Sequence, residues 1–135
     1  MAFVLDASVT LSWVLPGEEN PVAHLAERIL ESPGESAIVP SLWWYEVRNI
    51  LIVNERRGRI TQANTTLFLN QTASLRIFVD SNMDERLLLD LSRQARLTVY
   101  DAAYLALAMR ERLPPATLDK ALEEAALAAG VALLA

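Results

Sequence analysis

The sequence predicts an α/β protein in which helices cover both faces of a parallel β-sheet. Short apolar runs alternate with segments of helical periodicity along all 135 residues. The first run, Phe3-Val4-Leu5, leads directly into a lone carboxylate, Asp6, as is typical of a buried parallel strand. Strands that alternate with helices indicate βαβ units, whose right-handed crossovers favour a doubly wound sheet between two layers of helices.

Five apolar segments are expected to be strands: 3–5, 37–39, 76–79, 116–118 and 131–134. Ligands of an open α/β sheet bind beyond the carboxyl ends of its strands, where the strand order reverses. Asp6 follows the first of these segments and Asp119 follows the fourth. We therefore expect these two carboxylates to lie side by side at that edge.

Seven helices are expected between the strands: 7–15, 21–31, 42–57, 61–74, 84–94, 101–112 and 119–129. Asn20 followed by Pro21 has the residue types of an N-cap and a first helical position. Ser81 and Asp84 have the spacing of a capping box, and Gly58 is a candidate C-cap.

Length and composition indicate one compact domain, residues 1–135, with 53% hydrophobic residues for its core. The absence of cysteine excludes disulfides, thiolate zinc sites and thiol catalysis, and suits the cytoplasm, where we expect the protein. The N-terminus lacks the basic leading segment of a signal peptide, and no apolar run approaches the roughly 18 residues that cross a membrane. A net charge of −5 argues against broad affinity for nucleic acid, but a bound cation would cancel part of it.

Four carboxylates are candidate metal ligands: Asp6, Glu46, Asp101 and Asp119. Each also has a structural explanation, since three of them stand at helix starts and Glu46 could be a solvated helix residue. Glu46, however, lies among aromatic and aliphatic residues, and no lysine or histidine is placed to neutralise the set. Because converging carboxylates repel one another, they suit a hard divalent cation, and oxygen-only ligands favour Mg²⁺ or Mn²⁺ over zinc.

Four segments together resemble the PIN domain, and in particular the VapC toxins of type II toxin–antitoxin pairs: Val4-Leu5-Asp6-Ala7-Ser8, residues 45–51, residues 100–108 and residues 116–122. The resemblance covers nearly the whole chain. It implies a five-stranded parallel sheet of order 3-2-1-4-5 and a Mg²⁺-dependent endoribonuclease that leaves 5′-phosphate and 3′-hydroxyl ends. It also implies transfer or ribosomal RNA as substrate, a homodimer, and a cognate antitoxin protein that is normally encoded next door.

Carried over position by position, the family's acidic quartet matches Asp6, Glu46, Asp101 and Asp119. The resemblance also implies supporting roles for Ser8 and Thr117, as hydroxyls beside the carboxylates, and for Asn49, one helical turn after Glu46. The antitoxin groove is expected around 11–15 and 43–52, where Trp13, Trp43 and Trp44 lie.

Arg56 and Arg57 stand at the end of the third helix, with Arg59 just beyond. These cations could bind RNA phosphates, or they could simply stabilise the helix C-terminus.

Other functions fit the sequence less well. The only histidine, His24, reads as a solvated helix residue, which excludes a ribonuclease built on a histidine pair. An aspartyl-phosphate phosphatase needs a second Asp where Ser8 stands, and a receiver domain needs a late lysine after a strand, whereas Lys120 begins a helix. No glycine-rich phosphate loop is present. A non-catalytic PIN-like module that acts through protein partners remains the alternative, and metal titration discriminates the two.

Overall fold

A parallel sheet of four strands forms the centre of the computed structural model, which describes residues 2–135. The strand order is β3-β2-β1-β4, and every neighbouring pair is parallel. The strands are β1 (Ala2–Leu5), β2 (Ser36–Pro40), β3 (Ile77–Asp80) and β4 (Pro115–Ala116). The sequence-based prediction of a parallel α/β fold is therefore confirmed, with β1 between β2 and β4.

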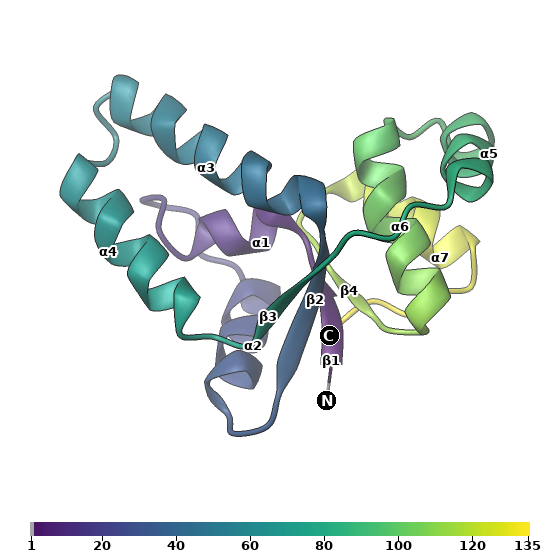
Figure 1. The fold of residues 1–135 in the computed structure, drawn as a ribbon, viewed down its shortest axis with the longest axis horizontal. Coiled ribbons are helices and arrows are strands. Elements are labelled where there is room, and N and C mark those ends of the chain that lie inside the picture. The colour runs from purple at the N-terminus through teal and green to yellow at the C-terminus, as the bar shows by residue number, and fades with distance from the viewer. Residues whose placement is uncertain (1) are drawn as a thin grey trace.

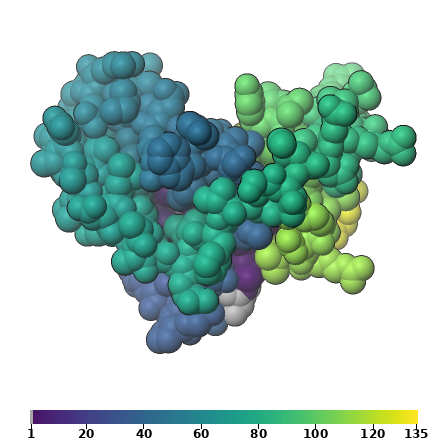
Figure 2. Space-filling model, viewed as in Figure 1, coloured from purple at the N-terminus to yellow at the C-terminus, as the bar shows by residue number. Residues whose placement is uncertain are grey.

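Within residues 2–135, seven helices surround this sheet: α1 (Ala7–Ser12), α2 (Pro21–Glu31), α3 (Ser41–Arg56), α4 (Gln62–Ala73), α5 (Glu85–Ala95), α6 (Val99–Glu111) and α7 (Lys120–Ala128). Figure 1 shows α1, α2 and α4 on one side of the sheet and α5, α6 and α7 on the other. In the space-filling view, the outline is notched between α3 and the α5–α6 pair (Figure 2). The carboxyl end of β1 leads into α1 at this end of the sheet.

The predicted fifth strand at 131–134 is wrong. After Gly130, whose φ is +76°, the Val131 N–H turns back to the Ala126 carbonyl at 2.8 Å. The segment then meets β4 through a single backbone hydrogen bond, from Leu134 N to Pro115 O at 3.0 Å. Because β4 has only two residues, it offers almost no ladder for another strand to extend.

Strand β4 is shorter than the predicted 116–118 because the following backbone groups bind side chains. The Leu118 N–H donates to Ser8 Oγ at 2.9 Å, and the Asp119 N–H donates to Thr117 Oγ1 at 3.0 Å. Both N–H groups therefore bind side-chain oxygens near the end of β1, where the candidate site lies, rather than a neighbouring strand.

Several helix boundaries differ from the prediction. Helix α1 ends at Ser12 rather than at residue 15, in a turn before Pro16. The N-cap of α5 is Asp84, whose Oδ1 accepts from Leu87 N at 3.1 Å, so Ser81 does not open that helix. Helix α6 begins two residues early, at Val99, because Thr98 caps it.

Other local signals are confirmed. Asn20 caps α2 through a 2.8 Å hydrogen bond from Val22 N, with Pro21 as the first helical residue. Gly58 follows α3 with φ of +71°, the left-handed conformation that ends many helices. No described helix has both the length and the apolar character that a membrane crossing requires.

The core lies between the sheet and its helices. Phe3, Val4 and Leu5 of β1 are fully buried. From α6, five consecutive residues, 104–108, are also buried, and α6 packs against β1, β2 and β4. Strand β1, which leads into Asp6, and helix α6, which carries Asp101, are therefore among the most enclosed parts of the fold.

Candidate active site

Asp6 lies at the carboxyl end of β1 and is only 6% exposed. Although it occupies the N-cap position of α1, its side chain makes no capping hydrogen bond. Asp6 Oδ2 instead accepts 2.6 Å hydrogen bonds from Ser8 Oγ and Thr117 Oγ1. Burial raises the pKa of Asp6 above its ordinary value of 3.8, although the two hydroxyl hydrogen bonds oppose the shift. The structural explanation of Asp6 as a helix cap therefore fails.

Ser8 and Thr117 link the ends of β1 and β4 around this carboxylate. Ser8 Oγ also accepts from Leu118 N, and the two hydroxyl oxygens lie 3.5 Å apart. Thr117 is 4% exposed and joins Asp6 to the Asp119 backbone. The loop after β4 is thus held against the start of α1. The negative charge of Asp119 lies close enough to raise the pKa of Asp6.

Glu46 reaches the same region from α3. It is half-buried, and its Oε1 accepts a 2.6 Å hydrogen bond from the hydroxyl of Tyr104 on α6. Burial raises the pKa of Glu46, and the charges of Asp6 and Asp101 raise it further. Glu46 is therefore not the freely solvated helix residue of the structural explanation.

Asp101 lies in the first turn of α6 and is also half-buried. Its backbone N–H donates to Thr98 Oγ1 at 3.1 Å, which gives the helix its cap. Burial raises the pKa of the Asp101 carboxyl, and the charges of Asp119 and Asp6 add to the shift. Thr98 therefore caps the helix, and the Asp101 carboxyl is coupled electrostatically to the other acids.

Asp119 has a clear structural role. It is the N-cap of α7, and its Oδ1 accepts from Leu122 N at 3.0 Å. Its charge nevertheless raises the pKa of both Asp6 and Asp101. The structure thus brings all four predicted carboxylates into one electrostatic neighbourhood.

The donor set matches a hard cation by its chemistry, since it consists of oxygen atoms only and carries several negative charges. None of the ion pairs in the described part of the chain involves these four acids. With the side chains as they stand, however, no three acidic or histidine groups within residues 2–135 are close enough to hold a metal ion together. The four carboxylates would therefore have to approach one another more closely for a cation to bind, and the positive charge of a cation would favour that approach.

The remaining predicted residues lie along α3. Asn49 is exposed, one turn beyond Glu46. Arg56 and Arg57 are exposed at the far end of that helix, whereas Arg59 binds Asn54 Oδ1 at 3.0 Å and lies 3.8 Å from Glu18. His24 is exposed on α2, as expected.

The three tryptophans have different environments. Trp43 is buried and donates to Thr10 Oγ1 at 3.0 Å, so it belongs to the core rather than to a groove. Trp13 is half-buried and donates to Ala23 O at 2.9 Å. Trp44 is 45% exposed, with the Arg48 guanidinium 3.8 Å from its ring centroid. The aromatic cluster is thus divided between the interior and the surface.

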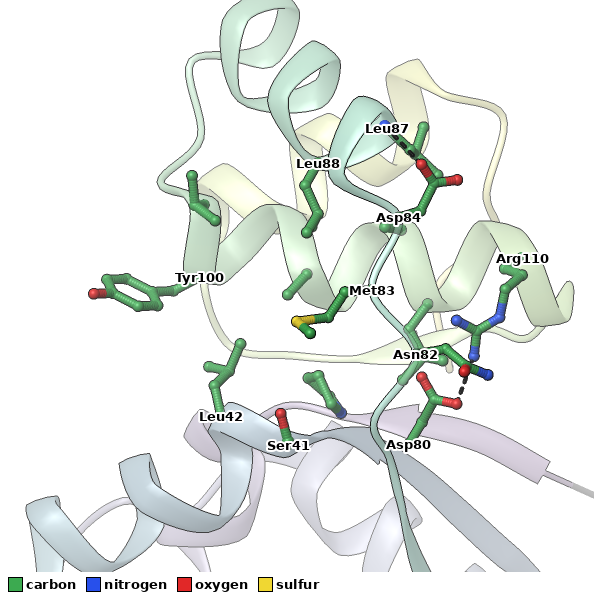
Figure 3. A pocket seen from close by; sticks show the side chains of 15 residues that line it. Ser41, Leu42, Asp80, Asn82, Met83, Asp84, Leu87, Leu88, Tyr100 and Arg110 are labelled. Carbon is green, nitrogen blue, oxygen red and sulfur yellow. Dashed lines mark hydrogen bonds and ion pairs between the residues drawn. The ribbon is translucent and has the colours of Figure 1, made fainter.

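An apolar cavity of about 250 Å³ lies on another face of α6. Figure 3 shows Leu42, Met83 and Leu88 around it, with the 2.8 Å Asp80–Arg110 ion pair at one end. The α6 residues that line it are Val99, Tyr100, Ala103, Ala106, Leu107 and Arg110. Neither Tyr104 nor any of the four candidate carboxylates lines this cavity, so it is distinct from the candidate site.

Sequence reasoning assigned no role to Tyr104, the partner of Glu46. A signal was available, because Tyr104 follows Asp101 by three residues and therefore shares its helix face.

Two solved structures share this fold. PAE2754 from Pyrobaculum aerophilum matches with a TM-score of 0.71 and 23% sequence identity, over 93% of this chain and 84% of that chain. VapC20 from Mycobacterium tuberculosis, a toxin that cleaves the sarcin-ricin loop, matches with a TM-score of 0.57 and 15% identity, over 93% of this chain and 95% of that chain. No curated protein matches the chain. A sequence model of the PIN domain matches residues 3–127, nearly the whole chain. By this match, the chain belongs to the PIN domain family.

Proposed function

We propose that this protein is a Mg²⁺-dependent endoribonuclease and the toxin of a type II toxin–antitoxin pair. The observation that carries the proposal is Asp6, a buried carboxylate held by two hydroxyls and surrounded by three further acids. Family membership and the fold shared with the VapC20 toxin support the same reaction class. Four acids without a cationic partner are costly to keep together in a purely structural protein.

Asp6, Glu46, Asp101 and Asp119 would hold the cation. When bound, Mg²⁺ or Mn²⁺ would bind the scissile phosphate, lower the pKa of a water and stabilise the leaving oxygen. Ser8 and Thr117 both donate to Asp6 Oδ2. The orientation of that carboxylate is therefore fixed by residues from two different segments of the chain. The raised pKa values of Asp6, Glu46 and Asp101 reflect mutual repulsion as well as burial, and a cation would relieve that repulsion.

The proposed reaction is hydrolysis of an RNA phosphodiester to 5′-phosphate and 3′-hydroxyl ends, with transfer or ribosomal RNA as the substrate. The purified protein should cleave a labelled RNA only when Mg²⁺ or Mn²⁺ is present. Gel analysis of the products with and without excess EDTA checks this. Cleavage that persists in excess EDTA contradicts the mechanism, and metal binding without any cleavage favours the non-catalytic alternative.

Exposed Arg56 and Arg57 are proposed to contact RNA phosphates. The double reversal Arg56→Glu/Arg57→Glu should weaken RNA binding and reduce the salt dependence of log Kd by roughly one unit of slope per lost contact. Fluorescence anisotropy at several salt concentrations, with Asp6→Asn as background to prevent cleavage, measures both effects.

The matched control for this pair is Arg28→Glu/Arg93→Glu, which reverses arginines in the last turns of α2 and α5. These two arginines are exposed as well, so the net change in charge is the same. If both double variants bind RNA equally, Arg56 and Arg57 merely stabilise the end of α3.

A cognate antitoxin and a second copy of the chain are the proposed partners. The surface of α3 supports a protein contact because Trp44, Tyr45 and Ile52 are 45%, 71% and 40% exposed. Trp13 and Val14 line a second hollow, together with Phe68 of α4. The antitoxin is proposed to bind along these apolar surfaces around residues 11–15 and 43–52.

A further inference from the structure

The Tyr104–Glu46 hydrogen bond joins α6 to α3 across the candidate site. We infer that Tyr104 is a positioning residue, which keeps the Glu46 carboxylate near the other acids so that a cation can draw them together. The inference rests on the proposed function, since it gives Glu46 its purpose. The bond is 2.6 Å long and links residues 58 positions apart in the sequence. Bonds of this length are typical of a hydroxyl that donates to a charged carboxylate.

Tyr104 is itself rigidly packed, so it can fix the position of the group that it binds. It is 1% exposed, and its neighbours Leu105 and Ala108 are fully buried, so the ring is fixed by packing. A phenol is protonated at neutral pH, so the hydroxyl is available as a donor.

Glu46 needs such support because the contacts that anchor α3 do not by themselves fix its side chain. One turn earlier, Trp43 anchors α3 through Thr10, whose Oγ1 in turn donates to the Asp6 carbonyl at 3.3 Å. That bond fixes the helix but not the Glu46 side chain, which is half-buried and has water within reach. The Tyr104 hydroxyl restrains this side chain near Asp6 and Asp101, and hydrogen bonds of this kind to ligating carboxylates tune metal affinity.

The variant Tyr104→Phe removes the hydroxyl and keeps the ring. Titration of the protein with Mn²⁺ by isothermal calorimetry, without RNA, should show affinity about tenfold weaker than in the wild type. Tyr100→Phe is the matched control, because it removes the same atom from a tyrosine that is 65% exposed. This control should bind Mn²⁺ as the wild type does.

A double-mutant cycle tests whether Tyr104 acts through Glu46. In a Glu46→Ala background, Tyr104→Phe should cause no further loss of Mn²⁺ affinity, because the group it positions is gone. An equal loss in both backgrounds overturns the inference, as does an affinity of Tyr104→Phe within about twofold of the wild type. Thermal unfolding of each variant establishes that the domain is still folded.

The outcome is separable from that of the nuclease proposal. If the wild type binds Mn²⁺ but cleaves no RNA, the proposed activity fails and the positioning role of Tyr104 is still decided by affinity. If the wild type binds no Mn²⁺, the positioning role is overturned.

Discussion

Asp6→Asn should abolish RNA cleavage, with a loss on the order of a thousandfold, the upper end of what removal of one charge-stabilising group costs. Asparagine has nearly the same size as aspartate and can still accept from Ser8 and Thr117, whose hydroxyls lie 2.6 Å from Asp6 Oδ2. The change therefore removes a negative charge and leaves the packing in place. Initial rates on labelled RNA at saturating Mg²⁺ measure the loss.

Asp90→Asn is the matched control, since Asp90 lies in the middle of α5 and outside the candidate site. It should cleave RNA at the wild-type rate. Full activity of Asp6→Asn would mean that the buried carboxylate has no part in the reaction, and the assignment of the site to this end of the sheet would be wrong.

The same substitution should stabilise the metal-free protein at neutral pH, by about 1 kcal/mol. Burial and the charge of Asp119 raise the pKa of Asp6 above 3.8, so the folded protein binds a proton more tightly than the unfolded chain does. Between pH 3.8 and the raised pKa, stability contributed by this group is lost as the pH rises, and above that pKa the loss is complete. Asparagine is neutral at every pH and avoids this loss.

Urea denaturation in EDTA checks the prediction at two pH values. At pH 7.5 the variant should be more stable than the wild type, and a gain of 1 kcal/mol corresponds to roughly 4 °C in Tm for a chain of this size. Near pH 3.5, where the carboxyl of the wild type is protonated, the difference should shrink. Mg²⁺ should then raise the Tm of the wild type at neutral pH more than that of Asp6→Asn. A variant less stable than the wild type at pH 7.5 would show that Asp6 is structural.

Local patterns predicted most elements because their causes lie within a few residues. Asn20 and Pro21 start α2 as expected, and Gly58 ends α3. The capping position of α5 was misplaced because Ser81 and Asp84 are both good N-cap residues, and only Asp84 directly precedes the helical backbone. Residues 131–134 have the composition of a strand, but a strand also needs a partner, and β4 is too short to provide one.

The sequence by itself determined a parallel α/β domain of the PIN family and the four carboxylates to examine, because apolar periodicity and short motifs are local properties. Only the tertiary structure decided what each carboxylate touches. Thr117 meets Asp6 across 111 residues and Tyr104 meets Glu46 across 58, and no local pattern encodes such distances. These contacts depend on how β4 aligns with β1 and how α6 packs against the sheet, so they appear only when the whole core is assembled.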